Sequence, residues 1–382
     1  MVPDNYVETI DKFNFLIRPY LDCLLSHPND KINLTSDPVR ITDCFSGCLN
    51  SSTKDQLKCD RFTLKIPYAQ QILSWQVIFD ASNLKEPPDF IFDAEDHDFH
   101  PPLADINSLV CWDWQNRESL VAVVTELLEH YQAYQLDRVN SNSTLHRHLR
   151  SLLAERPANM QLIVNRAERG LGTLNCLMKV AVDFSSIPTY LVSENPGRDG
   201  ATLHVCIPYP ESSSIQAQLY LSPSVENAFG GSSELRIPAF QSGMLMGDYF
   251  ANVKGLLENQ VRLISEGFEK RKDYIAAFIN HLGKSVLEYD VQSFSKITLL
   301  WEWNDFFFTF TVELPLYFPM DQPTFILKSV YHNQHKRPYT EKYSDFPYSP
   351  RWSGNEMVKR ASTFVLATIK DFQKASVNHS DK

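Results

Sequence analysis

The chain has 382 residues, which is more than one hydrophobic core usually supports and predicts two or three domains. Hydrophobic residues make up 43% and charged residues 21%, a composition that excludes wholesale disorder. Acidic residues outnumber basic residues by 46 to 36, giving a net charge of −10, so no footprint of binding to nucleic acid or anionic lipid is visible. The few glycines form no phosphate-binding loop, which makes nucleotide-dependent chemistry unexpected.

The beginning of the sequence carries no recognisable targeting signal. Asp4, Glu8 and Asp11 fall in the first twelve residues, and no basic region leads into an apolar run, so we expect an intracellular protein. The most apolar stretch, residues 299–318, is interrupted by acidic residues and alternates like a strand, which predicts no membrane span. In a reducing compartment the seven cysteines are expected to remain thiols.

The N-terminal third reads as a helix, a short sheet and further helices. Apolar residues recur at helical spacing over residues 6–25, which predicts a first helix. A polar loop is expected to continue to Asp60. Alternating or short apolar runs then predict strands at 62–66, 75–79 and 90–92, and helical spacing returns at 118–134 and 140–155.

The rest of the chain combines short strands with one long helical stretch. Strands are predicted at 161–164, 177–184, 203–207 and 219–221. Helical spacing over 249–278 is interpreted as two helices placed end to end. The clearest feature is a hairpin, because apolar residues alternate over 297–303 and 306–314 on either side of Asn304 and Asp305, a turn-forming pair.

Two proline-containing loops occupy equivalent places in this order of elements. Pro87 and Pro88 follow one predicted strand and lead into another, and Phe318, Pro319 and Pro323 do the same near the C-terminus. Aligned in one register, the two segments indicate that one architecture occurs twice. The loops resemble the Tyr-Pro-x-x-Pro-Pro loop of ubiquitin-conjugating E2 enzymes and of their inactive E2-variant relatives.

Longer segments along essentially the whole chain carry a more specific resemblance. They include residues 40–43, 66–69, 182–191, 270–278 and 347–352. Together they resemble the brain and reproductive organ-expressed protein (BRE) family. The resemblance implies an α+β fold of tandem E2-variant (UEV/RWD-like) modules, each a four-stranded antiparallel meander packed on helices. It places an N-terminal E2-variant module at 1–139, a middle RWD-like module at 140–273 and a C-terminal E2-variant module at 274–382.

The function that this resemblance implies is that of a non-catalytic scaffold. The family belongs to the BRISC deubiquitinase and to a related nuclear DNA-damage complex. The implied partners are a JAMM zinc deubiquitinase subunit, its MPN-domain pseudoenzyme scaffold subunit and a von Willebrand A-domain adapter. We therefore expect a cytoplasmic and nuclear protein with no cofactor and no enzymatic activity of its own, and direct contact with polyubiquitin stays open.

An active conjugating enzyme is the main alternative, because His100 and Cys111 lie about where an E2 places its His-Pro-Asn triplet and its thioester cysteine. That chemistry needs an exposed cysteine and an asparagine amide directed at the oxyanion. Pro102 stands in place of the asparagine, and the neighbouring Trp112 and Trp114 predict a packed, neutral thiol at Cys111. We interpret the site as degenerate. A free-standing ubiquitin-binding module is a third alternative.

Neither a second thioester site nor a metal site is expected. The last cysteine in the sequence is Cys206, which lies upstream of the second proline loop. Cys44 and Cys48 have a spacing found among zinc ligands, but no fourth ligand is evident near them and Cys59.

A proline-bounded loop near the C-terminus supplies the candidate partner-binding residues Tyr348, Arg351 and Trp352. Aromatic and arginine side chains contribute most of the binding energy in many protein interfaces. The competing interpretation is that such aromatic residues fill the core of the C-terminal module.

Overall fold

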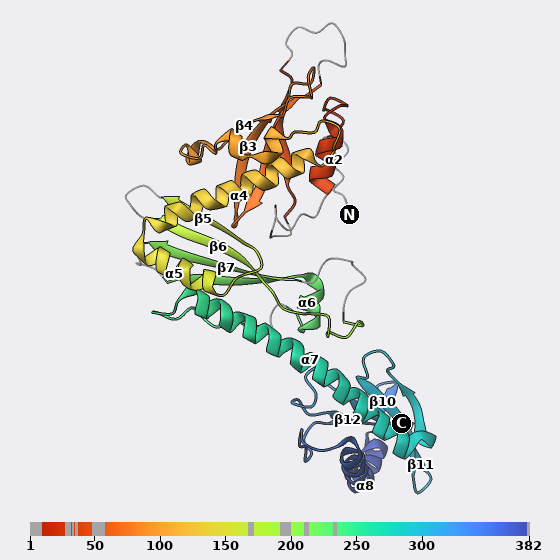
Figure 1. Ribbon diagram of the computed structural model, residues 1–382. Helices are drawn as coiled ribbons and strands as arrows, with labels where there is room; N and C mark the ends of the chain where they lie inside the picture. Colours follow the sequence, from red (N-terminus) through yellow and green to blue (C-terminus); the bar gives the residue numbers. More distant parts are fainter. Residues whose placement is uncertain are drawn as a thin grey trace. The chain divides into compact units, whose positions relative to one another are not determined.

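The fold is described from a computed structural model of the chain (Figure 1). The described residues are 10–26, 32, 34, 37–47, 58–166, 172–191, 200–209, 214–231 and 235–379. Within these ranges no helix combines the length and the apolar character needed to cross a membrane.

The described strands form three antiparallel sheets, which confirms the expected mixed α and β architecture. The first sheet contains β1 (Arg40–Phe45), β2 (Arg61–Tyr68), β3 (Gln71–Ile78) and β4 (Asp89–Ile91). The second contains β5 (Met160–Arg166), β6 (Gly172–Val180), β7 (Ala201–Tyr209) and β8 (Gln216–Leu221). The third contains β9 (Val286–Tyr289), β10 (Lys296–Trp303), β11 (Phe306–Glu313), β12 (Thr324–Gln334) and β13 (Arg337–Tyr343). The expectation of four strands in every sheet is therefore wrong for the third sheet, where β9 adds a fifth strand beside β10.

The helices connect and cover these sheets. They are α2 (Arg18–Ser26), α3 (Asn107–Val110), α4 (Ser119–Asn140), α5 (Ser143–Ala154), α6 (Pro223–Ala228), α7 (Met246–Leu282) and α8 (Gly354–Asn378). Short 3₁₀ turns, η2 (Ala94–Asp96), η3 (Leu103–Asp105) and η5 (Gly283–Ser285), lie between them. The two helices expected over 118–134 and 140–155 are confirmed as α4 and α5.

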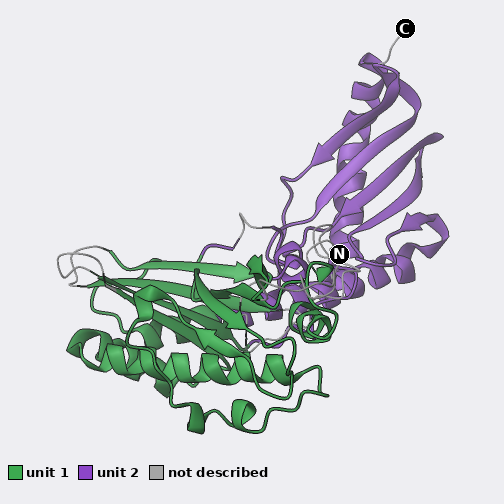
Figure 2. Ribbon diagram, turned by 90° about the horizontal axis from the view of Figure 1, so that it is seen from above, with its two compact units in different colours: residues 1–181, 200–221, 237–254 green, residues 182–199, 222–236, 255–382 purple. Residues whose placement is uncertain are grey.

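The chain divides into two compact units, coloured in Figure 2. Unit 1 comprises residues 1–181, 200–221 and 237–254, and unit 2 comprises residues 182–199, 222–236 and 255–382. Both units are discontinuous in sequence, and α7 supplies residues to each. The three modules with boundaries at 139/140 and 273/274 stay a prediction.

In unit 1 buried glutamines join the first sheet, the second sheet and α4. The backbone N–H of Ala69 donates to Oε1 of Gln161 at 3.1 Å, and the N–H of Val164 donates to Oε1 of Gln135 at 3.0 Å. Both glutamine side chains are buried. A buried polar group is costly without a partner, so these bonds specify how β2, β5 and α4 pack.

In unit 2 the expected hairpin is confirmed. Strands β10 and β11 pair in register from Lys296–Glu313 to Trp303–Phe306. Asn304 and Asp305 have φ of 48° and 63°, the left-handed conformation that a two-residue hairpin turn requires and that these residue types tolerate. One face of the hairpin packs against α8 and the C-terminal part of α7, and its Phe308, Phe310 and Val312 are buried.

Three sequence-based expectations are wrong. The helix expected over 6–25 is interrupted in its described part, because Phe13 enters a bridge with Cys59 and α2 begins at Arg18; residues 6–9 lie outside the described residues. Residues 40–45 form strand β1 and not a loop; its polar sequence lies at a sheet edge and shows no alternation. Residues 249–278 lie in one unbroken helix, α7, of 37 residues.

Helix α7 is held close to the loop that follows β11. A Cβ atom on Gly267 would lie 2.7 Å from the carbonyl oxygen of Phe318, which is closer than a side chain can approach. One turn later, Arg271 is 1% exposed, and its Nη1 donates to the carbonyl oxygen of Leu316 at 2.7 Å. The glycine permits the approach and the arginine stabilises it, so the loop has a fixed position on the helix.

We predict opposite effects for one substitution at two glycines of α7. Gly267→Ala should lower the free energy of unfolding by about 2 kcal/mol, because overpacking forces the loop away from the helix. Gly255→Ala, where no atom lies within 4 Å of the new Cβ, should raise it by up to about 1 kcal/mol through helix propensity. Urea denaturation followed by circular dichroism measures both, and equal effects at the two positions would contradict the close approach.

Candidate conjugation site and partner-binding residues

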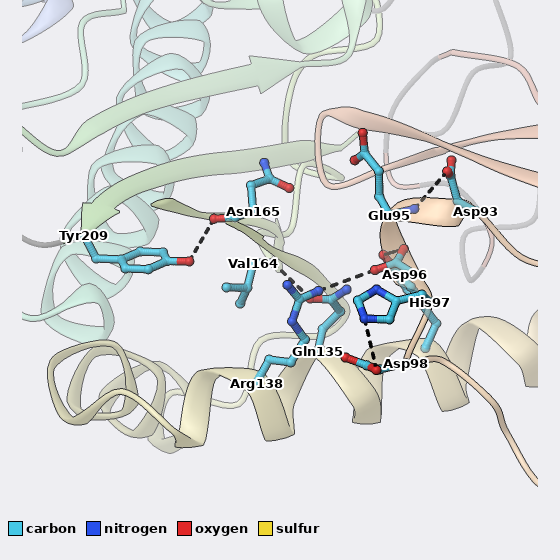
Figure 3. A network of polar contacts seen from close by, with 11 residues as sticks. Asp93, Glu95, Asp96, His97, Asp98, Gln135, Arg138, Val164, Asn165 and Tyr209 are labelled. Atoms are coloured by element: carbon cyan, nitrogen blue, oxygen red, sulfur yellow. Dashed lines mark hydrogen bonds and ion pairs between the residues drawn. The ribbon is translucent and has the colours of Figure 1, made fainter. Parts of the chain in front are cut away.

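The loop that would hold a conjugation site is anchored by a buried carboxylate (Figure 3). Asp96, in η2, accepts hydrogen bonds from the hydroxyl of Tyr131 at 2.6 Å and from Nη1 of Arg138 at 3.4 Å. Burial of the phenol and its bond to Asp96 raise the pKa of Tyr131 well above its usual value, so it stays a donor. Asp93 caps η2 by accepting from the N–H of Glu95 at 3.4 Å. These contacts position the loop on α4.

The remaining polar residues of this loop face solvent. His97 and Asp98 form an exposed pair, with Nε2 and Oδ1 3.3 Å apart. His100 and Pro102 are also exposed, and Pro102 occupies the cap of η3 in extended backbone, with no side-chain hydrogen bond at the cap. Because a proline side chain carries no amide, this position supplies no donor for an oxyanion.

Cys111 is exposed, so the expectation of a packed thiol is wrong. Helix α3 ends at Val110, and the backbone N–H of Cys111 closes its last turn by donating to Asn107 O at 2.8 Å. Trp112 turns inward instead: its Nε1 donates to Leu84 O at 3.0 Å, and its ring packs against Tyr20 with centroids 5.5 Å apart. The bulky neighbour therefore fills the core without covering the thiol.

The first proline loop lines an apolar pocket of about 290 Å³ beside this segment. Pro87 and Pro88 form one wall, and the other lining includes Phe90, Leu103 and Val110. Leu103 and Val110 are largely exposed. The prolines are recognisable in the sequence but this pocket is not, because its walls come from segments about twenty residues apart.

The structure brings the second proline loop and the candidate partner-binding segment together. The hydroxyl of Tyr348 donates to the carbonyl oxygen of Pro319 at 2.5 Å, and the peptide bond between Phe318 and Pro319 is cis. Phe318 and Pro323 are buried. Burial, with a contribution from the charge of Asp321, raises the pKa of Tyr348 to about 12. Tyr348 therefore has a packing role in unit 2.

Trp352 and Arg351 differ in accessibility. Trp352 is half-buried against the core of unit 2, and the guanidinium of Arg360 lies over its ring, 4.3 Å from the centroid. Arg351 is exposed and is free to meet a partner. Partner binding by these residues stays a prediction.

The cysteines in the first unit do not assemble a metal site among the described residues, where no group of three or more His, Cys, Asp or Glu side chains could hold a metal ion. Burial raises the pKa values of both Cys44 and Cys59, with a further contribution from Cys59 at Cys44 and from the charge of Asp60 at Cys59. Cys48 lies outside the described residues.

Comparison with known proteins gives one consistent result. The family model of the brain and reproductive organ-expressed protein (BRE) matches residues 11–333. A Danio rerio protein named BRISC and BRCA1-A complex member 2 is 43% identical over 369 residues, covering 94% of each chain. A Branchiostoma floridae protein of the same name is 40% identical over 369 residues, covering 95% of this chain and 96% of its own length.

We predict that Cys111 is accessible but does not accept ubiquitin. With activating enzyme, ATP and ubiquitin, no thiol-sensitive band larger by one ubiquitin should appear on a gel, because loss of an oxyanion donor lowers such rates by about 10²- to 10³-fold. A thioester that disappears in Cys111→Ala would contradict this expectation.

Alkylation of the same sample provides the control for accessibility. In the native protein at about pH 8, iodoacetamide should label Cys111 but not Cys176, since only the thiolate reacts. Burial raises the pKa of Cys176 to about 12, so its thiol stays protonated as the pH rises until that value is approached. In urea both should be labelled, as measured by mass spectrometry of the peptides.

Proposed function

This chain belongs to the brain and reproductive organ-expressed protein family, and from that premise we propose that it is a non-catalytic scaffold subunit of a JAMM-type deubiquitinase assembly like BRISC. The observation that carries the proposal is the similarity to two proteins named as members of the BRISC and BRCA1-A complexes, which extends over 94% and 95% of this chain. Similarity over so much of the chain favours a shared role in assembly, because a single shared motif would match only a short segment.

The chemistry of this assembly would lie in other chains. The partners we propose are a JAMM zinc deubiquitinase subunit, an MPN-domain pseudoenzyme scaffold subunit and a von Willebrand A-domain adapter. This chain would support their assembly and the recognition of polyubiquitin, in the cytoplasm and in the nuclear response to DNA damage. Three E2-variant or RWD-like modules, at 1–139, 140–273 and 274–382, would provide the docking surfaces.

One observation favours a second candidate function, that of an active conjugating enzyme. Cys111 is exposed, as an acceptor thiol must be. Two facts argue against an active enzyme. Pro102 supplies no amide for the oxyanion, and the residues of unit 2 include no cysteine that could accept ubiquitin. The scaffold function explains both the retained E2-like segments and the lost chemistry.

We predict that deubiquitinase activity requires the partners. The purified chain should cleave no polyubiquitin, whereas the chain co-expressed with the three proposed subunits should co-purify with them and cleave it. A zinc chelator should remove that activity while the circular dichroism of this chain stays unchanged, because the metal would be bound elsewhere. Cleavage by this chain alone, or failure of the four chains to co-purify, would overturn the proposed function.

We also predict that Arg351→Glu weakens binding of the von Willebrand A-domain adapter by about tenfold or more, as expected for an arginine in the centre of an interface. Arg351 is exposed, so the fold should be unaffected, unlike in Trp352→Ala. Arg337→Glu, at another exposed arginine of unit 2, serves as the matched control. Calorimetric titration measures the affinities, and equal values for both variants would remove Arg351 from the interface.

A further inference from the structure

Unit 2 contains a large pocket between α7 and the loop that follows β11. Its volume is about 760 Å³. Gly267 and Phe318 are buried in its floor, whereas Met320 at its edge is 70% exposed. An unbranched, polarisable side chain in such a position adapts to apolar groups of different shape. The pocket therefore offers an apolar centre that is open to solvent.

The walls of this pocket are fixed by hydrogen bonds. Nε2 of Gln260 donates to the hydroxyl of Tyr317 at 2.7 Å, and this hydroxyl donates to Phe229 O at 2.9 Å. The bond from Arg271 to Leu316 O holds the same loop on α7. A pocket that is already ordered loses little conformational entropy when it is occupied, which suits it for docking.

The rim of the pocket is acidic. Four carboxylates, those of Glu266, Glu269, Asp273 and Asp321, line it together with one ammonium group, that of Lys270. All five side chains are exposed. Glu266 is paired with Arg262 at 2.9 Å and Glu269 more distantly with Lys272 at 3.9 Å, and exposed pairs of this kind are weak. The excess of negative charge remains available to a partner.

The acidic surface continues along α7. A second hollow of about 320 Å³ shares Ser265 and Glu266 with the pocket, and its lining adds two carboxylates, Asp183 and Glu258, and one guanidinium, that of Arg262. A bound segment could therefore follow the helix past a single apolar anchoring point. Nucleic acids and anionic lipids would be repelled by this surface, and a second copy of the chain would bring its own net charge of −10.

We propose that this pocket docks a basic segment of a partner protein, in which an apolar side chain enters beside Met320 and flanking lysines or arginines pair with the rim. The proposal rests on the proposed function only in that the partner is a chain of the same assembly. Complementary charge of this kind directs association and selects among partners, and the apolar anchor provides the buried contact.

Photo-crosslinking in the assembled complex tests the proposal. The variant Met320→p-benzoylphenylalanine is co-expressed with the three proposed partners, irradiated and digested, and the crosslinked peptide is sequenced by mass spectrometry. We expect one partner segment with an apolar residue flanked by at least two basic residues. A crosslink to a neutral or acidic segment, to a second copy of this chain or to nothing would overturn the proposal.

Charge reversal at the rim tests whether the crosslinked segment is bound through its charges or merely lies near Met320. Glu269→Lys with Asp273→Lys should lower the crosslink yield by about tenfold or more, as loss of charge complementarity predicts. Asp345→Lys with Asp371→Lys makes the same change in net charge at exposed positions of unit 2 outside the pocket, and should lower the yield less than twofold. Equal yields for the two pairs would overturn the proposal.

Co-expression with the three proposed partners also separates failure of the proposed scaffold function from failure of the proposed docking pocket. If the four chains do not co-purify, the proposed function fails and this inference fails with it. If the assembly forms and Met320 yields no basic partner segment, only this inference fails.

Discussion

Unit 2 depends on the burial of one guanidinium group. Arg271 cannot lose its proton under physiological conditions, so its N–H groups need acceptors in the core. They donate to Ser293 O at 3.0 Å, to Leu316 O at 2.7 Å and to the hydroxyl of Tyr190 at 2.6 Å. These acceptors come from three separate segments, the farthest of which is 81 residues away in sequence. One side chain thus fixes the loop before β10, the loop after β11 and the segment around Tyr190 to a single turn of α7.

This constraint explains why unit 2 is discontinuous in sequence. Tyr190 belongs to a segment that lies between β6 and β7 along the chain, yet it is part of unit 2. The loop before β10 is also ordered by Asp290, which accepts hydrogen bonds from Ser293 and Ser295. Burial alone would raise the pKa of Asp290, but these bonds outweigh it and hold the pKa well below its usual range. The carboxylate therefore stays ionised near the guanidinium and contributes favourable charge.

Features that depend on neighbours in sequence were predictable, and features that depend on distant contacts were not. The hairpin at Asn304 and Asp305 follows from strict alternation and a turn with positive φ, both of which are local. By contrast, nothing in the charged run at residues 270–273 distinguishes Arg271 from its neighbours, although it lies on the helix face that also buries Tyr274 and Phe278. At the candidate conjugation site, sequence showed that Pro102 replaces an asparagine, but the direction of Trp112 depends on Leu84, 28 residues away. Exposure of Cys111 follows from that contact and from the end of α3, neither of which residue spacing reveals.

The two proline loops line pockets of different chemistry. In unit 1, Pro87 and Pro88 line a small pocket whose other walls are almost entirely apolar. In unit 2, Phe318 and Pro319 line a larger pocket with an acidic rim. A basic segment that suits the acidic pocket of unit 2 would lose the hydration of its charges in the apolar pocket of unit 1 and find no acidic rim there to pair with, which is costly. An apolar segment suited to the first would leave the carboxylates of the second unpaired. Under the proposed scaffold function, the two proline loops would therefore suit chemically distinct occupants.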